Sequence, residues 1–199
     1  MRIARIAVFL AGIGLAGFAA WALLHERSYA QMAGHGHGQG HMQHHGADGT
    51  GHDEVNMPGL RGVDASPEES AEMAVMFRNF DRITRSVTRL PDGIRTVTGS
   101  DDPEVMAAIA SHVTGMIARV EEGRDPQVFI QSPTLDIFFE RGDRISTQID
   151  VTDQGIVVVQ TTEDAELVKA LHTHAGEVTA MADRGMQAVH EMMMRRSGN

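Results

Sequence analysis

The chain has 199 residues, of which 42% are hydrophobic and only 5% are aromatic. This length suits one domain with appendages, and its core is expected to be aliphatic and filled by some of the 13 methionines. Cysteine is absent, which excludes disulfides, thiolate metal sites, c-type haem attachment and cysteine nucleophiles. The formal charge of −10 argues against nucleic acid as a partner and favours cations.

Residues 1–30 have the features of a signal peptide. Arg2 and Arg5 precede an uncharged apolar run at residues 6–24, and the tripeptide SYA at residues 28–30 has the small-x-small pattern of a cleavage site. The run is long for a signal peptide and sufficient to span a bilayer, which also suits a membrane anchor that is not cleaved. Both interpretations predict that the rest of the chain lies outside the cytoplasm, as a periplasmic protein, a secreted protein or a protein anchored to the inner membrane by its N-terminus.

Residues 31–65 are predicted to form a flexible tether, because they contain mainly Gly, His, Asp and Met and almost nothing to bury. Imidazoles on a glycine-rich backbone can converge on one metal ion, and thioethers add ligands for Cu(I). The histidine-rich tether is therefore expected to collect metal ions without much selectivity, with a plain solvated linker as the alternative. Its candidate metal ligands are His35, His37, His41, His44, His45 and His52, accompanied by Met32, Met42 and Met57.

An internal repeat occupies the rest of the chain. Asp81–Gly123 aligns without a gap with Asp143–Gly185, and the identical pairs include Asp81 with Asp143, Gly93 with Gly155 and His112 with His174. Repeat 1 covers about residues 66–124 and repeat 2 about residues 132–196. The two halves are therefore interpreted as copies of one module, which together make a duplicated domain over residues 66–196.

Each copy is predicted to contain the same elements in the same order. In the first, a capping box at Ser66 opens a helix to about Asp81, followed by the strand ITRSVTRL, the turn PDG, the strand IRTVTG and a long helix capped by Asp102. In the second, a helix from Pro133 precedes the strand ISTQIDV, the turn TDQG, the strand IVVVQT and a long helix capped by Asp164. The predicted fold class is α+β, with two tandem α-β-β-α repeats that form a four-stranded antiparallel sheet, helices on one face and a pseudo-two-fold axis.

The most specific stretch of the repeat is LPDGIRTVTGSDDPEVMAAIASHV at residues 90–113. Together with IVVVQTTEDAELVKALHTHA in the second copy, it resembles a family of uncharacterised exported bacterial proteins with a duplicated LPxG(I/V)xTVTxSDDPEV…HV module. The resemblance covers roughly residues 57–195 and implies an exported, duplicated α+β domain without an established activity. It also implies a histidine where Phe80 and Arg141 stand, so this chain lacks two ligands that a family-wide metal site would use.

One histidine recurs at the same position in both copies. His112 lies within the apolar stripe of the first long helix, and His174 lies at the equivalent position of the second. His172 faces the opposite side of its helix and is expected to be solvated. Because equivalent residues can face each other across a two-fold axis, His112 and His174 are candidate ligands of copper, of zinc or of a bis-histidine haem b. The alternative is that both are core histidines bonded to backbone or carboxylate groups.

Methionine and histidine also share helical faces elsewhere in the sequence. Met116 lies one turn beyond His112 on the same face and forms an HxxxM pair suited to copper. In the C-terminal segment GMQAVHEMMMRRSGN, His190 shares a predicted helical face with Met193 and Met194. The alternative for this second cluster is a methionine-rich helix that packs on the core or on a partner.

No catalytic constellation is present, because the sequence has neither a nucleophile elbow nor a complete HExxH motif. We therefore expect an exported, periplasmic metal-binding protein with copper as the favoured ion, held through His112 and His174 with Met116 or His190 in support. A b-type haem or electron-transfer module on the same two histidines is the first alternative, and a non-catalytic protein-interaction module is the second. Metal ions are the expected partners, with a homodimer or a periplasmic redox or metal partner as further options.

Overall fold

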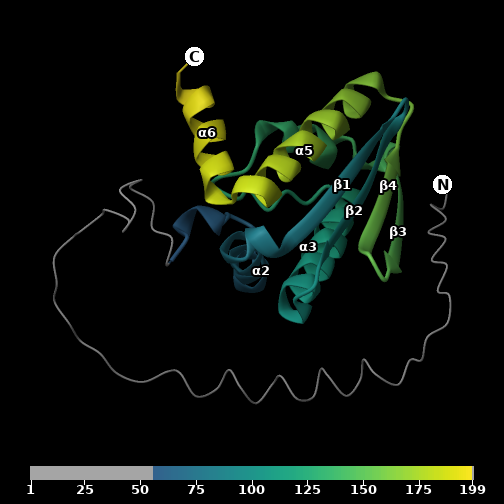
Figure 1. Ribbon diagram of the computed structural model, residues 1–199. Coiled ribbons are helices and arrows are strands. Elements are labelled where there is room, and N and C mark those ends of the chain that lie inside the picture. The colour runs from purple at the N-terminus through teal and green to yellow at the C-terminus, as the bar shows by residue number, and fades with distance from the viewer. Residues whose placement is uncertain (1–55, 199) are drawn as a thin grey trace, which may run out of the picture. The chain divides into compact units, whose positions relative to one another are not determined.

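The computed structural model describes residues 56–198 of the chain (Figure 1). The predicted signal peptide or anchor at residues 1–30 and the six tether histidines lie outside the described residues. Among the described helices, none is long and apolar enough to cross a membrane. The main elements are α2 (Pro67–Arg78), β1 (Ile83–Leu90), β2 (Gly93–Ser100), α3 (Pro103–Glu122), α4 (Asp136–Glu140), β3 (Ser146–Thr152), β4 (Gly155–Thr161), α5 (Ala165–Arg184) and α6 (Met186–Ser197). Short 3-10 turns lie at η2 (Pro58–Leu60), η3 (Phe80–Arg82), η4 (Pro133–Leu135) and η5 (Gly142–Arg144).

The four strands form one antiparallel sheet in the order β1-β2-β4-β3. Each repeat contributes one hairpin, and the return strands β2 and β4 pair with each other in the centre. Thr96 pairs with Val158, which is its own counterpart in the second repeat, so the pseudo-two-fold axis passes through this central pair. The predicted α+β fold, with a duplicated hairpin unit and helices packed against a four-stranded sheet, is confirmed.

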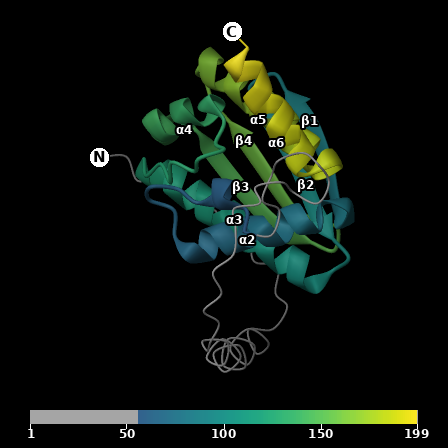
Figure 2. The same ribbon diagram turned by 90° about the vertical axis from the view of Figure 1, so that its left-hand side faces the viewer.

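The helices lie on one side of the sheet (Figure 1). Seen from the helical side, α2 and α6 lie in front of the long helices α3 and α5, and the strands lie behind them (Figure 2). Strand residues that point towards the helices are buried, such as Ile94 and Ile156. Residues on the other face of β1 are exposed and polar, namely Thr84, Ser86 and Thr88. The strands therefore alternate as expected for an antiparallel sheet with one covered face.

Each long helix packs on the hairpin of the other repeat. Leu167 of α5 lies in one core cluster with Ile94 of the first hairpin. Val105 of α3 lies in a second core cluster with Ile156 of the second hairpin. Leu167 and Val105 are counterparts, as are the two isoleucines, so the two clusters are copies of one arrangement. The two repeats therefore share their core residues, although α3 also packs on β2 of its own repeat.

Both long helices begin with the same capping arrangement. Oδ1 of Asp102 accepts hydrogen bonds from two backbone N–H groups of the first turn of α3, at 2.8 and 3.2 Å. Oδ1 of Asp164 does the same at the start of α5, at 3.0 and 3.4 Å. The other carboxylate oxygen binds the guanidinium group that precedes each hairpin, from Arg82 or Arg144. The predicted caps are confirmed, and the ion pairs explain why these arginines are identical in the two repeats.

The ordered domain extends further towards the N-terminus than Ser66, although the predicted capping box at that residue is present. Leu60 is only 2% exposed, and Gly62 pairs with Val128, which lies between the two repeats, in an isolated β-bridge. Residues 57–65, which the composition assigns to the tether, therefore belong to the folded domain. Their partner segment lies beyond the whole of repeat 1 in the chain, so local composition does not reveal the contact.

The leading helix differs between the repeats. α2 is a full helix of 12 residues, whereas the second copy has only η4 and α4, which is five residues long. A Cβ atom at Gly142 would lie 2.1 Å from the carbonyl oxygen of Val120, so the chain passes against α3 immediately after α4.

Candidate functional site

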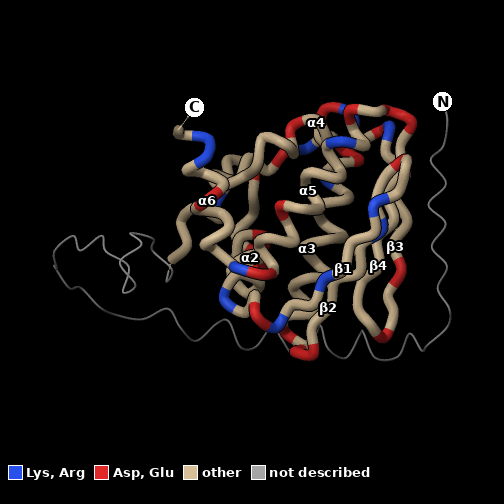
Figure 3. The backbone as a smooth tube through the Cα atoms, turned by 45° about the horizontal axis from the view of Figure 1, so that its top comes forward, with Lys and Arg blue, Asp and Glu red and all other residues tan. Residues whose placement is uncertain are grey.

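The two recurring histidines lie in the middle of the long helices, His112 on α3 and His174 on α5. Charged residues gather mainly at the turns and helix ends, and the middle of α3 is uncharged (Figure 3). Each imidazole has a buried Nδ1 atom that makes no hydrogen bond within the described part of the chain. Buried nitrogens without a partner are unusual in folded proteins, which marks these two as candidates for binding a ligand.

Electrostatics relate the two imidazoles to each other. Burial lowers the pKa of His112 from 6.5 to about 4, while the charge of Glu69 opposes this shift and His174 adds to it. The two imidazoles therefore lie within electrostatic range of each other. His112 is therefore neutral at neutral pH, with a proton on one ring nitrogen and a lone pair on the other.

Glu177 lies one turn after His174 on α5. Its Oε1 accepts hydrogen bonds from the Ser132 hydroxyl at 2.8 Å and from the Thr134 hydroxyl at 3.2 Å. Its Oε2 is buried, lacks a hydrogen-bond partner among residues 56–198, and lies 3.8 Å from Nδ1 of His174. Burial opposes ionisation of this carboxyl, but the neighbouring His174 and Ser132 outweigh it and hold the pKa of Glu177 below its usual value.

His112, His174 and Glu177 together form the His–Glu group. In the described residues four buried side-chain nitrogen or oxygen atoms have no hydrogen-bond partner, and three of them belong to this group. Two of these three, Nδ1 of His174 and Oε2 of Glu177, lie at ion-pair distance from each other. Two imidazole nitrogens and one carboxylate oxygen are donors of the type that transition metals bind. No three His, Asp or Glu side chains within residues 56–198 are already close enough together to hold a metal ion. The structure thus places His174 beside Glu177 on α5 and His112 on α3, without assembling three such side chains into a metal site.

Sequence analysis does not single out Glu177, although a signal for it exists. Its spacing from His174 is HxxE, which places the two side chains on the same side of α5. What buries the carboxylate is the segment at the start of repeat 2, which supplies Ser132. That contact spans 45 residues and has no sequence signature.

Two neighbouring groups shape the surroundings of the histidines. The ring of Phe138 meets that of His174 edge to face, with 5.7 Å between the ring centroids. The carboxylate of Glu69 is bound by the guanidinium of Arg119, with 2.8 Å between Nη2 and Oε2. Glu69 therefore acts on His112 through its charge, and its oxygens are already engaged.

The remaining predicted ligands lie on α3 and α6. Met116 is half-buried on α3, and its counterpart on α5 is Val178, so only repeat 1 offers a thioether at this position. His190 is half-buried on α6, whereas Met193 and Met194 are 39% and 59% exposed. The predicted C-terminal helix is present, and it buries Ala188, Val189 and Met192.

His172 is not solvated, which corrects the prediction for this residue. Its Nε2 lies 2.8 Å from the carbonyl oxygen of Gly93 and 3.1 Å from that of Leu90. Since both partners are acceptors, Nε2 carries the proton and donates it. His172 thus ties α5 to the turn of the first hairpin, a partner that helical periodicity alone does not identify.

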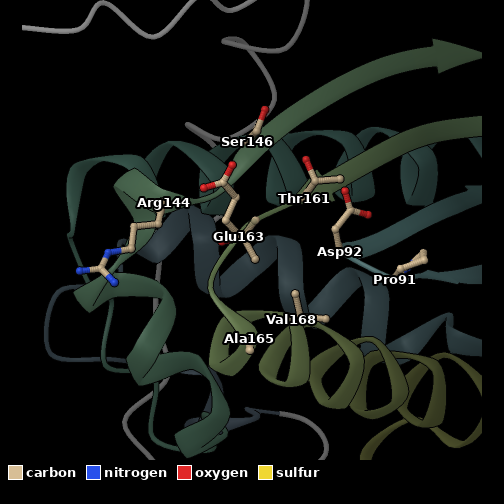
Figure 4. Close-up of a pocket in the computed structure, with 9 residues that line it drawn as sticks. Pro91, Asp92, Arg144, Ser146, Thr161, Glu163, Ala165 and Val168 are labelled. Atoms are coloured by element: carbon tan, nitrogen blue, oxygen red, sulfur yellow. The ribbon is translucent and has the colours of Figure 1, made fainter.

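A separate surface hollow of about 630 Å³ lies where β4 ends and α5 begins (Figure 4). Its lining includes the acidic residues Asp92 and Glu163 together with Arg144. The guanidinium of Arg144 is already bonded to the helix-capping Asp164. None of the buried unpartnered atoms among the described residues belongs to this lining, so the His–Glu group is the stronger candidate site.

The two positions at which the family resemblance implies histidine have other contacts. Phe80 lies against Gly185 at the end of α5, and Arg141 binds Asp164 and Glu166 at its start. In comparisons with known proteins, no family model, curated protein or solved structure matched this chain.

Proposed function

We propose that this is an exported metal-binding protein that captures a transition-metal ion, with copper favoured, between His112 and His174. The observation that carries the proposal is the pair of buried Nδ1 atoms, one from each repeat, that have no hydrogen-bond partner in residues 56–198. A structural core histidine normally satisfies its ring nitrogens. The charge effect of His174 on His112 supports an ion that both histidines share.

The chemistry of the donors supports a transition metal. Burial keeps His112 neutral at neutral pH, so no proton has to be displaced from it when an ion binds. Imidazole suits copper, zinc and nickel, and Cu(II) binds most tightly among the divalent first-row ions. In this proposal the histidine-rich tether collects ions and the duplicated domain retains one of them.

The test uses the full chain with the six tether histidines, Met32 and Met42 replaced by serine, which we call the tether-silent chain. Titration with Cu(II) is expected to show one tight site, and replacing both His112 and His174 with Ala should weaken it about 100-fold or more. His172→Gln is the matched control, because His172 lies on the same helix but donates to the backbone. Unchanged affinity in the double variant would overturn the proposal.

The two alternative functions give different results with the same proteins. A b-type haem held by the two histidines would give a Soret band in protein purified from haem-replete cells. An interaction module with purely structural histidines would show no change of melting temperature or oligomeric state when metal is added to the tether-silent chain.

A further inference from the structure

We infer that one face of the folded domain docks on the surface of an anionic lipid bilayer. This face, which we call the apolar-basic patch, consists of residues 61–63, residues 127–131 and the end of α6 at residues 193–196. The inference is independent of metal binding. It is carried by exposed apolar side chains that gather on this face together with exposed arginines.

Most of the large apolar side chains that are exposed in the described residues belong to the patch. Within residues 56–198 these exposed side chains are Val63, Phe129, Val151, Met193 and Met194. All of them except Val151 lie in the three segments of the patch. Phe129 is 64% exposed, although phenylalanine is among the residues most often buried. Exposed apolar groups that gather in this way, with polar residues around them, mark an interaction surface.

Hydrogen bonds hold the three segments of the patch together. Residues 61–63 and 127–131 meet at the isolated β-bridge, where the backbone N–H of Phe129 donates to the carbonyl oxygen of Arg61 at 2.9 Å. Nη1 of Arg196 donates to the carbonyl oxygen of Gln131 at 2.9 Å, which ties the end of α6 to the same loop. The segment before α2 and α6 both lie on the side of the domain that faces away from the sheet (Figure 1). The fold therefore places these side chains on one face.

The free charges of the patch are positive. Arg61, Arg195 and Arg196 are exposed, and none of them makes an ion pair within the described part of the chain. In contrast, the acidic residues Asp64 and Glu191, which flank the patch in the chain, are each bound by an arginine. Because the chain as a whole has a formal charge of −10, an anionic surface repels most of it and attracts this face. The charge distribution thus complements an anionic lipid surface.

The chain that leads into the domain favours a bilayer as the occupant of the patch. The apolar run at residues 6–24 is predicted to be a signal peptide or a membrane anchor, and the predicted tether joins the domain directly before residue 61. A glycine-rich coil of the length of this tether has an end-to-end distance of roughly 30 Å, so an anchored domain stays close to the bilayer. At such short range the local concentration of lipid is high, and a weak surface contact is sufficient for docking.

The side chains of the patch suit the boundary between lipid headgroups and acyl chains. Phe129, Met193 and Met194 supply apolar surface that can enter this boundary, and the thioethers adapt to an irregular environment. The guanidinium groups can bind lipid phosphates, and each basic residue near an anionic membrane strengthens binding about fivefold. Apolar insertion and charge attraction therefore act on the same face.

The experiment uses the full chain with Trp21→Phe and Phe129→Trp, so that the single tryptophan lies in the patch. EDTA is present to remove metal ions. The protein is reconstituted with vesicles of brominated phosphatidylcholine, with or without phosphatidylglycerol as the anionic lipid. With phosphatidylglycerol, the tryptophan emission is expected to shift to the blue and to be quenched, because bromine quenches only an indole that enters the lipid. Adding Arg195→Gln and Arg196→Gln should lower the ratio of quenched to unquenched protein about 20-fold.

Val151 offers a matched control position. It is 69% exposed, but β3 lies on the opposite side of the domain from α6 (Figure 1). A chain with Trp21→Phe and Val151→Trp should therefore remain unquenched in the same vesicles, although the same tether holds it near them. All the replaced side chains within the domain are exposed, and thermal unfolding checks that each variant is folded.

Four results contradict docking through this patch. The first is a tryptophan at position 129 that stays unquenched with phosphatidylglycerol, and the second is equal quenching at positions 129 and 151. The third is quenching at position 129 that persists without phosphatidylglycerol and without the two arginines. The fourth is a blue shift that occurs without vesicles and grows with protein concentration, which would assign the patch to contact with a second copy of the chain.

Discussion

The two repeats share their folding devices and differ in their buried charges. The same aspartate and arginine cap the long helix in each repeat, and one histidine lies at the same position of each long helix. In contrast, Glu177 has Gly115 as its counterpart, and Arg119 has Met181. The duplicated unit therefore carries one histidine at the same position of each copy, and a nearby acidic residue in only one of them. Positions at which the counterpart residues of the two repeats differ in charge are therefore candidates for a functional role.

The copies also differ in how they are anchored to the rest of the domain. In repeat 1, the buried Arg119 binds Glu69 of α2 and Asp64 of the segment before it. In repeat 2, His172 binds two backbone carbonyls of the first hairpin. Exchanging residues between counterpart positions therefore tests which differences are structural.

The largest effect on stability is expected when residue 119 of repeat 1 is replaced by its counterpart in repeat 2. Arg119→Met leaves the partly buried carboxylate of Glu69 without its guanidinium partner, and the free energy of unfolding should fall by about 3 kcal/mol. Urea unfolding at neutral pH measures this loss. Adding Glu69→Met should recover part of it, since no uncompensated charge then remains. A loss below about 1 kcal/mol would show that this buried ion pair does not anchor repeat 1.

The next largest effect concerns pH and His112. The unfolded chain protonates this histidine near pH 6.5, whereas the folded protein does so only at about pH 4. As pH falls through this window the unfolded state binds the extra proton, so the free energy of unfolding should decrease by roughly 3 kcal/mol. Above this pH range His112 is neutral in both the folded and the unfolded state, so its effect on the free energy of unfolding no longer changes with pH. The groups with a charge effect on His112 are Glu69, which opposes the shift, and His174, which adds to it.

Urea unfolding at a series of pH values measures the predicted decrease, and His112→Gln removes the titrating group. The variant should lose most of the slope between pH 6.5 and pH 4. An equal slope in the parent and in the variant would mean that other groups cause it.

Adding the missing acid to repeat 1 should sharpen the comparison between the two copies. A Cβ atom at Gly115 would meet no other atom within 4 Å, so a side chain fits at this position of α3. Gly115→Glu in the tether-silent chain is expected to raise Zn(II) affinity about tenfold. Gly115→Ala is the matched control, because alanine strengthens the helix without adding a carboxylate. Equal affinities of the two variants would count against a site close to the pseudo-two-fold axis.

The smallest effect is expected where the repeats are alike. Asp102→Ala and Asp164→Ala each remove one helix cap and should each lower the free energy of unfolding by about 1 kcal/mol. Thermal or urea unfolding of the two variants checks whether the losses are equal. A difference larger than about 1 kcal/mol between them would show that the two caps are not equivalent devices.

Much of the fold could be predicted because its signals are local and occur twice. The β-branched strands IRTVTG and IVVVQT and the capping residues Asp102 and Asp164 lie at the same offset in both copies. The packing of each helix on the other repeat's hairpin could not be predicted, since it depends on contacts between distant segments. The burial of Leu60 could not be predicted either, because its neighbours in the chain are polar or glycine and its contacts are with distant segments.

The candidate site could be predicted only in part. Helical periodicity placed His112 and His174 on the inner faces of their helices, and symmetry suggested that they belong together. Periodicity assigned His172 to solvent, because its acceptors are backbone groups 79 and 82 residues away. Glu177 was missed for a related reason, since only the distant Ser132 and Thr134 distinguish it from an exposed glutamate.

The most direct measurement is the number of Cu(II) ions bound by the tether-silent chain and by its His112→Ala and His174→Ala single variants, determined by equilibrium dialysis. If one histidine from each repeat shares one ion, the parent binds one ion per chain tightly and either single substitution removes that tight binding. Two tight ions per parent chain, or a single variant that keeps full affinity, would contradict a shared site.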